Sequence, residues 1–227
     1  MNKVLCIIPA RSGSKEIKNK NIKKFNGKPL IYYSIQFAKK LKFINKIIFS
    51  TDSKRYLNYA NKYYRFGKLL RPKRFSKDNS KAIDYVKFEI NRLKNYKEFK
   101  FLLLLQPTSP FREKKKFIQA FKILKKNLCD SIISSKIVKQ HPLLMHKYKN
   151  KVVYFSKNYK RAFAGRQSYP KLYLRQGSMY FTKISTLLKT NSLHGGKTKH
   201  IVMNGKFAID LDSKEDLILL KNYFKNN

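Results

Sequence analysis

The chain has 227 residues, of which 42% are hydrophobic and 14% aromatic, so it can form a packed core and is not a disordered basic tail. Its 53 Lys and Arg residues far outnumber its 12 Asp and Glu residues, and the formal charge of +41 favours anionic partners such as nucleotides or nucleic acid. Because the basic residues are spread along the whole chain, we expect nucleic acid to bind only non-specifically.

Short apolar runs alternate with amphipathic stretches in the N-terminal part of the chain. The predicted strands are Val4–Ile8, Lys46–Ser50, Gly67–Leu70, Phe101–Leu105 and Ser131–Ile137. The predicted helices are Pro29–Lys40, Lys54–Tyr64, Ala82–Leu93 and Glu113–Lys126. The trio Thr51-Asp52-Ser53 is expected to cap the second of these helices. This alternation predicts an α/β fold with a mainly parallel, doubly wound sheet.

The pattern changes after about residue 138. The segment Gln140–Gln176 is rich in Tyr, Lys and Arg and lacks a helical period, which predicts an inserted lobe or a contact between subunits. Further strands are expected at Gly177–Phe181, Lys199–Met203 and Phe207–Leu211. A last helix is expected over Lys214–Phe224, capped by Ser213. Because no repeat or low-complexity linker divides the chain, we expect one domain over residues 1–227.

No stretch of the sequence suggests a membrane or secretory segment. Apolar runs stay shorter than the roughly 18 residues that a membrane span needs. The first apolar run is short and ends at Arg11, which is a poor match to a signal peptide. Cys6 and Cys129 form no disulfide framework and are expected to be core thiols in a reducing compartment, so we expect a cytoplasmic protein.

The loop after the first predicted strand combines cations, hydroxyls and a glycine. It contains Arg11, Ser12, Gly13, Ser14 and Lys15, at the edge where open parallel sheets bind ligands. Gly13 allows the backbone to approach a ligand closely, and the cations and hydroxyls suit a triphosphate. The spacing is not that of a Walker P-loop, and a basic turn without a ligand is the alternative interpretation.

Two further polar motifs follow predicted strands. The segment Gln106–Arg112 is either a rigid proline turn or a second ligand loop. Asp210 and Asp212 are expected to share one side of the chain, because Leu211 between them points the other way in a strand. Both carboxylates could then bind Mg²⁺, although Asp212 could instead support the N-terminus of the next helix. The four histidines show no metal-binding spacing.

Taken together, these motifs resemble a known family. The order is I-P-A-R-x-G-S-K…N, G-K-P-L-I, S-T-D, L-L-Q-P-T-S-P-x-R, R-Q, G-x-x-Y and D-x-D, from Val4 to about Leu220. It is similar to that of the acylneuraminate cytidylyltransferases, which include CMP-sialic acid synthetases and their legionaminic and pseudaminic acid relatives. The resemblance implies a GT-A-like fold, CTP and a nine-carbon 2-keto sugar acid as substrates, and Mg²⁺ as cofactor. It also implies a homodimer whose inserted lobe, about residues 140–170, contacts the partner.

The resemblance implies roles for individual residues. The nucleotide loop would comprise Arg11, Ser14, Lys15 and Asn21, and the base and ribose pocket Arg71 and Ser80. The sugar side would comprise Gln106, Thr108, Ser109, Arg166, Gln167 and Tyr180. The metal carboxylates would be Asp210 and Asp212, and the catalytic residues Arg11, Lys15 and Asp210.

The chain also departs from the family pattern. Glu16 and Lys18 stand where the family usually has Gly and Pro, and Leu174-Arg175-Gln176 stands where sialic acid members often have Asn before the glycine. Two alternatives therefore stay open. One is a cytidylyltransferase for another 2-keto sugar acid, such as 3-deoxy-octulosonate. The other is a catalytically impaired relative that binds polyanions or RNA.

Overall fold

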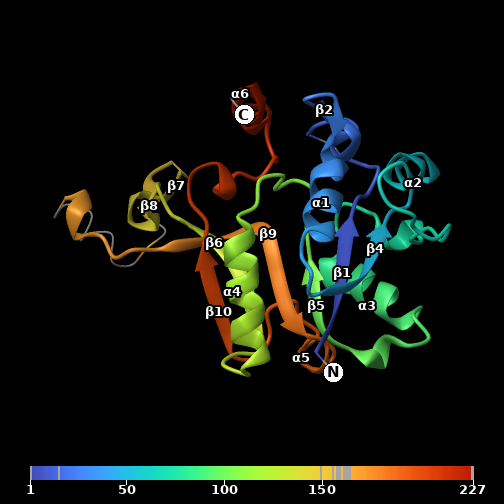
Figure 1. Ribbon diagram of the computed structural model, residues 1–227. Helices are drawn as coiled ribbons and strands as arrows, with labels where there is room; N and C mark the ends of the chain where they lie inside the picture. The colour runs from blue at the N-terminus through green and yellow to red at the C-terminus, as the bar shows by residue number, and fades with distance from the viewer. Residues whose placement is uncertain are drawn as a thin grey trace.

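A six-stranded sheet forms the centre of the computed structural model (Figure 1), which describes residues 2–14, 16–148, 150–154, 156, 160 and 165–225. The strand order is β10-β6-β9-β5-β1-β4. The strands are β1 Lys3–Pro9, β4 Ile44–Ser50, β5 Phe99–Leu104, β6 Ser131–Ile137, β9 Tyr173–Lys183 and β10 Thr198–Val202. β1 runs parallel to β4 and β5, and β6 runs parallel to β10, whereas β9 runs antiparallel to both β5 and β6. The expected α/β fold with a mostly parallel sheet is confirmed, with β9 as the exception.

Helices cover both faces of this sheet. They are α1 Leu30–Lys39, α2 Lys54–Asn61, α3 Ala82–Asn91, α4 Lys114–Lys125 and α5 Ile184–Thr190. The last helix, α6 Lys214–Lys225, packs instead against Phe25 and Leu30 at the start of α1. Alternate residues of β1 point to opposite faces: Cys6 and Ile8 join the core under α1, α2 and α4, while Leu5 and Ile7 join the core under α3 and α5. The continuous apolar run of β1 therefore reflects a strand that is buried on both sides.

Most predicted elements occur within a few residues of their expected bounds, but two predicted strands are wrong. Gly67–Leu70 pairs with no strand in the described sheet, and Leu69 is 67% exposed. In place of a strand at Phe207–Leu211 the chain forms a 3-10 turn, Gly205–Ala208. Ile209 and Leu211 then pack against α6, so their apolar side chains cover a helix rather than a sheet.

Polar caps explain where two of the helices begin. Ser53 Oγ accepts a hydrogen bond from Tyr56 N at the start of α2, as the sequence predicts. At α6, Ser213 Oγ accepts from Asp216 N, and the Asp216 carboxylate accepts in return from Ser213 N. These reciprocal bonds form a capping box, so the carboxylate of Asp212 is not needed as the cap.

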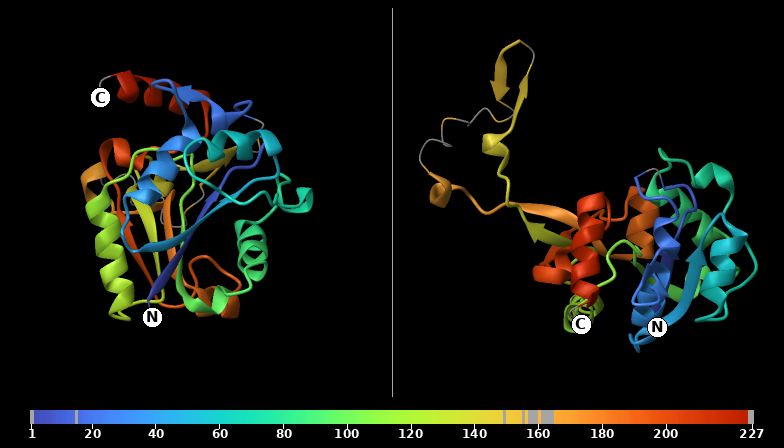
Figure 2. Two further views of the ribbon diagram at one scale, coloured as in Figure 1. Left: turned by 45° about the vertical axis from the view of Figure 1, so that its right-hand side comes forward. Right: turned by 90° about the horizontal axis from the view of Figure 1, so that it is seen from above.

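Between β6 and β9 the chain leaves the sheet and projects as an arm, defined here as residues 138–172 (Figure 2). A hydrogen bond from Val138 N to Leu172 O, 2.9 Å long, closes the base of the arm. A hairpin of β7 His146–Tyr148 and β8 Val152–Tyr154 lies within it. All three residues of each of these strands are exposed. No helix in the described part of the chain is long and apolar enough to cross a membrane.

Candidate active site

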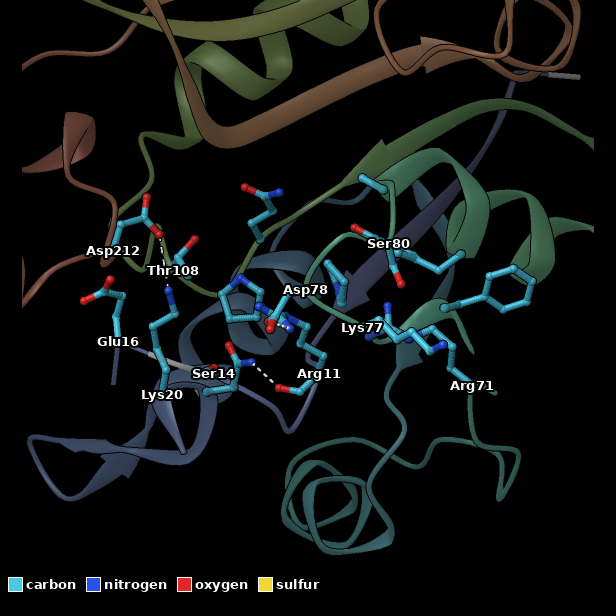
Figure 3. A pocket seen from close by; sticks show the side chains of 17 residues that line it. Arg11, Ser14, Glu16, Lys20, Arg71, Lys77, Asp78, Ser80, Thr108 and Asp212 are labelled. Carbon is cyan, nitrogen blue, oxygen red and sulfur yellow. Dashed lines mark hydrogen bonds and ion pairs between the residues drawn. The ribbon is translucent and has the colours of Figure 1, made fainter. Parts of the chain in front are cut away.

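A cavity of about 680 Å³ lies beyond the carboxyl ends of β1 and β5 (Figure 3). Its walls come from the loop after β1, the segment between α2 and α3, the loop after β5 and the chain before α6. Eight of the residues expected at a ligand site line it together: Arg11, Ser14, Asn21, Arg71, Ser80, Gln106, Thr108 and Asp212. The cavity thus lies where an open α/β sheet binds its ligand.

The loop after β1 is held in place from two sides. Ser12 donates from its backbone N to Asp52 Oδ1 at 2.9 Å and from its hydroxyl to Asp52 Oδ2 at 2.8 Å. Asn21 Nδ2 donates to Arg11 O at 3.0 Å, which ties the end of the loop to its beginning. Asp52 therefore shapes the loop instead of capping α2, a role that its place in a cap motif did not reveal. Lys15, expected here as a catalytic cation, lies outside the described residues.

One wall of the cavity combines a buried cation with aromatic rings. The side chain of Arg71 is almost completely buried, and its Nε donates to Ser76 Oγ at 3.0 Å. Its guanidinium lies 4.6 Å from the ring centroid of Tyr85, close enough for a cation–π interaction. Burial lowers the pKa of Arg71, and the nearby Tyr85, Asp52 and Glu89 partly oppose that shift. An aromatic and apolar wall next to hydroxyl groups suits a nucleoside.

Opposite this wall, Lys20 joins the two ends of the chain. Its Nζ donates to Leu211 O at 2.8 Å and to Asp212 Oδ1 at 3.2 Å. Figure 3 shows Glu16, Lys20 and Asp212 on the same side of the cavity. Sequence reasoning missed Lys20, because it stands in a run of similar lysines with nothing to distinguish it. The structure thus adds two lysines, Lys20 and Lys77, to the cavity beside Arg11 and Arg71.

Asp210 and Asp212 have different surroundings. Asp212 is exposed and lines the cavity, whereas Asp210 is partly buried and lies behind the lining residues. Asp210 accepts hydrogen bonds from the Ser109 hydroxyl, from Gly177 N at 2.9 Å and from Gln176 Nε2 at 3.3 Å. Burial raises the pKa of Asp210, and the bonds from Ser109 and Gly177 partly oppose that shift. The strand that placed both carboxylates on one side is absent, so the basis for that expectation is wrong.

A bulge in β9 brings Gly177 against this network. Ile133 of β6 pairs with Tyr180, but the next residue, Ser134, pairs with Gln176, so β9 carries extra residues between the two pairs. A Cβ on Gly177 would overlap Gln106 Oε1 and would lie 3.2 Å from Asp210 Oδ1. A larger residue at this position would force the end of the Gln106 side chain to move.

The loop after β5 is supported by a buried arginine. Arg112 Nη2 donates to Gln106 O at 2.5 Å, and burial lowers the pKa of Arg112 to about 10. The backbone N of Leu211 donates to Thr108 O at 2.9 Å, which joins this loop to the segment that carries Asp212. These bonds fix the loop so that Gln106, Pro107 and Thr108 line the cavity, and its role as a ligand loop stays a prediction.

Among the expected sugar-side residues, Gln167 and Tyr180 do not line the cavity, and Ser109 lies behind it, bonded to Asp210. Tyr180 lies beside the Asp210 network, under the Arg175 guanidinium, whose Cζ is 6.0 Å from the ring centroid. Burial raises the pKa of Tyr180. Gln167 is exposed on the arm, and neither it nor Tyr180 is among the described residues that line the cavity. The side chain of Arg166 lies outside the described part of the chain.

The sheet and its helices define an α/β protein whose cavity combines cations with an aromatic wall, features that suit a phosphorylated nucleoside. A sequence profile of the family described as "Cytidylyltransferase" matches residues 5–225. The chain belongs to this cytidylyltransferase family and is a nucleotidyltransferase.

Three curated relatives are similar in sequence to this chain over nearly its whole length. Post-translational flagellin modification protein B of Campylobacter coli is 33% identical, over 99% of this chain and 96% of that protein. The CMP-N,N'-diacetyllegionaminic acid synthase of Campylobacter jejuni is 32% identical, over 98% of this chain and 97% of the relative. The N-acylneuraminate cytidylyltransferase of Escherichia coli O18:K1:H7 is 31% identical, over 96% of this chain, but the match covers only 51% of that longer relative.

Solved structures confirm the fold. A CMP:2-keto-3-deoxy-manno-octonic acid synthetase complexed with CTP has a TM-score of 0.71 at 13% identity, and the match covers 99% of each chain. The 4-diphosphocytidyl-2C-methyl-D-erythritol synthase of Anaerococcus prevotii has a TM-score of 0.67 at 15% identity, with 98% of each chain covered. At these identities the likeness concerns the fold alone.

The first prediction concerns Gly177. Gly177→Ala should displace the Gln106 side chain and lower the rate of CTP-dependent pyrophosphate release by about tenfold or more, because a misplaced site residue costs catalysis steeply. Steady-state kinetics would measure the loss. Gly67→Ala is the matched control, since a Cβ there meets nothing within 4 Å. Equal rates in both variants would contradict the role given to Gly177.

Proposed function

We propose that the chain transfers CMP from CTP to a nonulosonic acid, a nine-carbon 2-keto sugar acid of the sialic type, and releases pyrophosphate. The single observation that carries this proposal is the convergence of Arg11, Ser14, Arg71 and Gln106 on one cavity in a chain of the cytidylyltransferase family. Relatives named for legionaminic, pseudaminic and N-acylneuraminic acids match nearly the whole chain, which supports this acceptor class.

The reaction is a displacement at phosphorus. The anomeric hydroxyl of the acid attacks the α-phosphorus of CTP, an oxygen–phosphorus bond forms, and the bond to the β-phosphate oxygen breaks. Pyrophosphate leaves with the electron pair of that bond, and the hydroxyl proton passes to a base or to water. We assign Arg11, Lys20 and the expected cation Lys15 to the triphosphate, where they stabilise the negative charge that moves to the departing pyrophosphate.

The two ends of the cavity receive different substrates in this proposal. The wall of Arg71, Ser80 and Tyr85 receives the cytidine, because it combines an apolar surface with polar groups. Gln106 and Thr108 face the acid, with Ser109 and Asp210 directly behind them. Because Asp210 lies behind the lining residues, we assign it to positioning Ser109 and the loop after β5 beside the attacking hydroxyl. Arg166, Gln167 and Tyr180 remain predicted contacts of the acid.

The carboxylates present fit a magnesium ion that is held mainly by its nucleotide. No cluster of three or more His, Cys, Asp and Glu side chains occurs among the described residues, so a cage made only of protein ligands is not formed there. Mg²⁺ commonly uses one or two carboxylates together with phosphate oxygens and water. Asp212 would hold it at the cavity, with Asp210 behind, and the ion would neutralise charge on the triphosphate.

The experiment that tests the function measures pyrophosphate release from CTP with a panel of acids. The panel contains N-acetylneuraminate, legionaminate, pseudaminate and the eight-carbon 3-deoxy-octulosonate. We expect at least one nine-carbon acid to support turnover about tenfold faster than the eight-carbon acid, since a misfitting substrate loses about that much transition-state binding. Preference for the eight-carbon acid would favour the other sugar-acid enzyme. No release with any acid, together with RNA binding that survives physiological salt, would favour the impaired polyanion-binding relative.

A second prediction tests the metal assignment. Asp212→Asn should raise the Mg²⁺ concentration needed for half-maximal rate by about tenfold, because one charged metal ligand is lost. A magnesium titration at saturating CTP would measure the shift. Asp84→Asn is the control, since Asp84 lies on α3 and does not line the cavity. It should leave the magnesium requirement unchanged, and an unchanged requirement in Asp212→Asn would contradict the metal role.

We also propose that the fold is GT-A-like and that the reaction takes place in the cytoplasm.

We propose further that the arm pairs two copies of the chain. Several apolar side chains on the arm are exposed, including Met145 at 45%, Val152 at 49% and Val153 at 46%. Exposed apolar groups that gather on one projection are typical of an interaction surface. A symmetric pair of arms is the simplest arrangement that covers them.

This dimer generates a third prediction. The wild-type chain should have a mass of about twice 27.0 kDa by light scattering after size-exclusion chromatography. The double substitution Val152→Asp with Val153→Asp should produce a monomer, because burying charges at an apolar contact is costly. Leu69→Asp, on an exposed residue outside the arm, should leave the dimer intact. A monomeric wild-type chain would exclude this assembly.

A further inference from the structure

An ion pair crosses the cavity between two segments far apart in the sequence. Arg11 Nη1 lies 2.6 Å from Asp78 Oδ1, and the two side chains remain 35% and 45% exposed (Figure 3). Arg11 follows β1, whereas Asp78 belongs to the segment before α3, and both line the cavity. A cation that the proposed function gives to the triphosphate is thus bound by a carboxylate of the same chain.

Hydrogen bonds within its own segment of the chain fix the position of Asp78. A 3-10 turn over Lys73–Phe75 is followed by hydrogen bonds from Ser80 N to Lys77 O and from Ser80 Oγ to Arg74 O, each 3.1 Å long. These bonds fold the segment around Asp78. The carboxylate is therefore presented to Arg11 by a local turn.

A carboxylate and a phosphate make the same kind of contact with a guanidinium. Both accept short, charge-assisted hydrogen bonds from its N–H groups. The Nη1 hydrogen that Asp78 accepts cannot at the same time donate along the same line to a phosphate oxygen. The charge of Asp78 also repels any phosphate that approaches Arg11.

We infer that Asp78 competes with the polyphosphate for Arg11 and thereby makes the cavity select metal-bound over metal-free polyphosphate. This inference rests on the proposed triphosphate site. The repulsion between Asp78 and a ligand grows with the ligand's negative charge. Mg²⁺ removes two negative charges from the triphosphate, so the magnesium complex is repelled less than free CTP. The same selection acts against rebinding of the metal-free pyrophosphate product.

Other acidic residues of the cavity do not face Arg11 in this way. Glu16 and Asp212 lie on the side of Lys20, and Asp212 is paired with that lysine. Asp52, which does not line the cavity, is bonded to Ser12 and shapes the loop. Asp78 is therefore the cavity carboxylate that lies directly against Arg11, where the phosphate is proposed to bind.

The test measures CTP affinity by isothermal titration calorimetry, once with excess Mg²⁺ and once with EDTA. Asp78→Asn should strengthen binding of the magnesium complex by less than about twofold and of metal-free CTP by about fivefold, the upper end of the scale of a partly exposed ion pair. Inorganic pyrophosphate without metal should gain about as much as metal-free CTP. Asp84→Asn, on α3 and not lining the cavity, removes the same charge and should change each affinity less than about twofold.

A second set of variants tests whether the effect passes through Arg11. In an Arg11→Ala background, Asp78→Asn should no longer favour metal-free CTP over its magnesium complex. Asp78→Glu, which keeps the charge, should preserve the wild-type preference for the magnesium complex. Equal gains for both forms of CTP, weaker binding in Asp78→Asn, or a preference that persists without Arg11 would each overturn the inference while leaving the proposed function intact. A wild-type chain that binds CTP in neither condition would overturn the proposed function and this inference with it.

Discussion

The site depends on one partly buried carboxylate, that of Asp210. A carboxylate that loses water is stable only when other donors replace that water, and here the donors come from two different segments. Ser109 belongs to the loop after β5, and Gln176 and Gly177 belong to β9. The chain before α6, which carries Asp210, is thereby joined to two neighbouring strands of the sheet. Because Asp210 is held in this way, Asp212, two residues further along the chain, is placed at the cavity.

The balance of acidic and basic residues in the cavity differs from that of the whole chain. The whole sequence has only 12 acidic residues against 53 basic ones, yet three of the acids, Glu16, Asp78 and Asp212, line a single cavity. A cavity with cations alone would bind any polyanion strongly, including its own product. Carboxylates next to the cations lower that general affinity for polyanions. The cavity thus differs chemically from the basic surface around it.

Much of the fold and part of the site follow from sequence patterns. The strands β1, β5 and β6 are short apolar runs with polar ends, and the helices between them show a clear amphipathic period, so local patterns suffice to place them. Arg11 and Gln106 could be expected at the site because parallel strands end at a common edge.

Other features depend on contacts between distant residues and could not be predicted. Lys20 is one lysine among many until its bonds to Leu211 and Asp212 single it out. Asp52 belongs to a helix-cap motif, and only its hydrogen bond from Ser12 shows that it also holds the loop after β1. The apolar residues near Leu211 fit a strand equally well by pattern, but they bury themselves against α6 instead. In each case the interacting residue lies on another segment of the chain, so the local sequence pattern contains no signal for the contact.

The direction of β9 has the largest consequence of these unpredicted features. Because β9 runs against β5 and β6, its first residue, Tyr173, lies at the edge of the sheet where the parallel strand β6 ends at Ile137. The arm begins and returns at that edge, which is also the edge that carries the cavity. The same reversal places the bulge at Gly177 next to Gln106 and Asp210. One antiparallel strand therefore links the base of the arm to Gln176 and Gly177, the residues of β9 that hold Asp210.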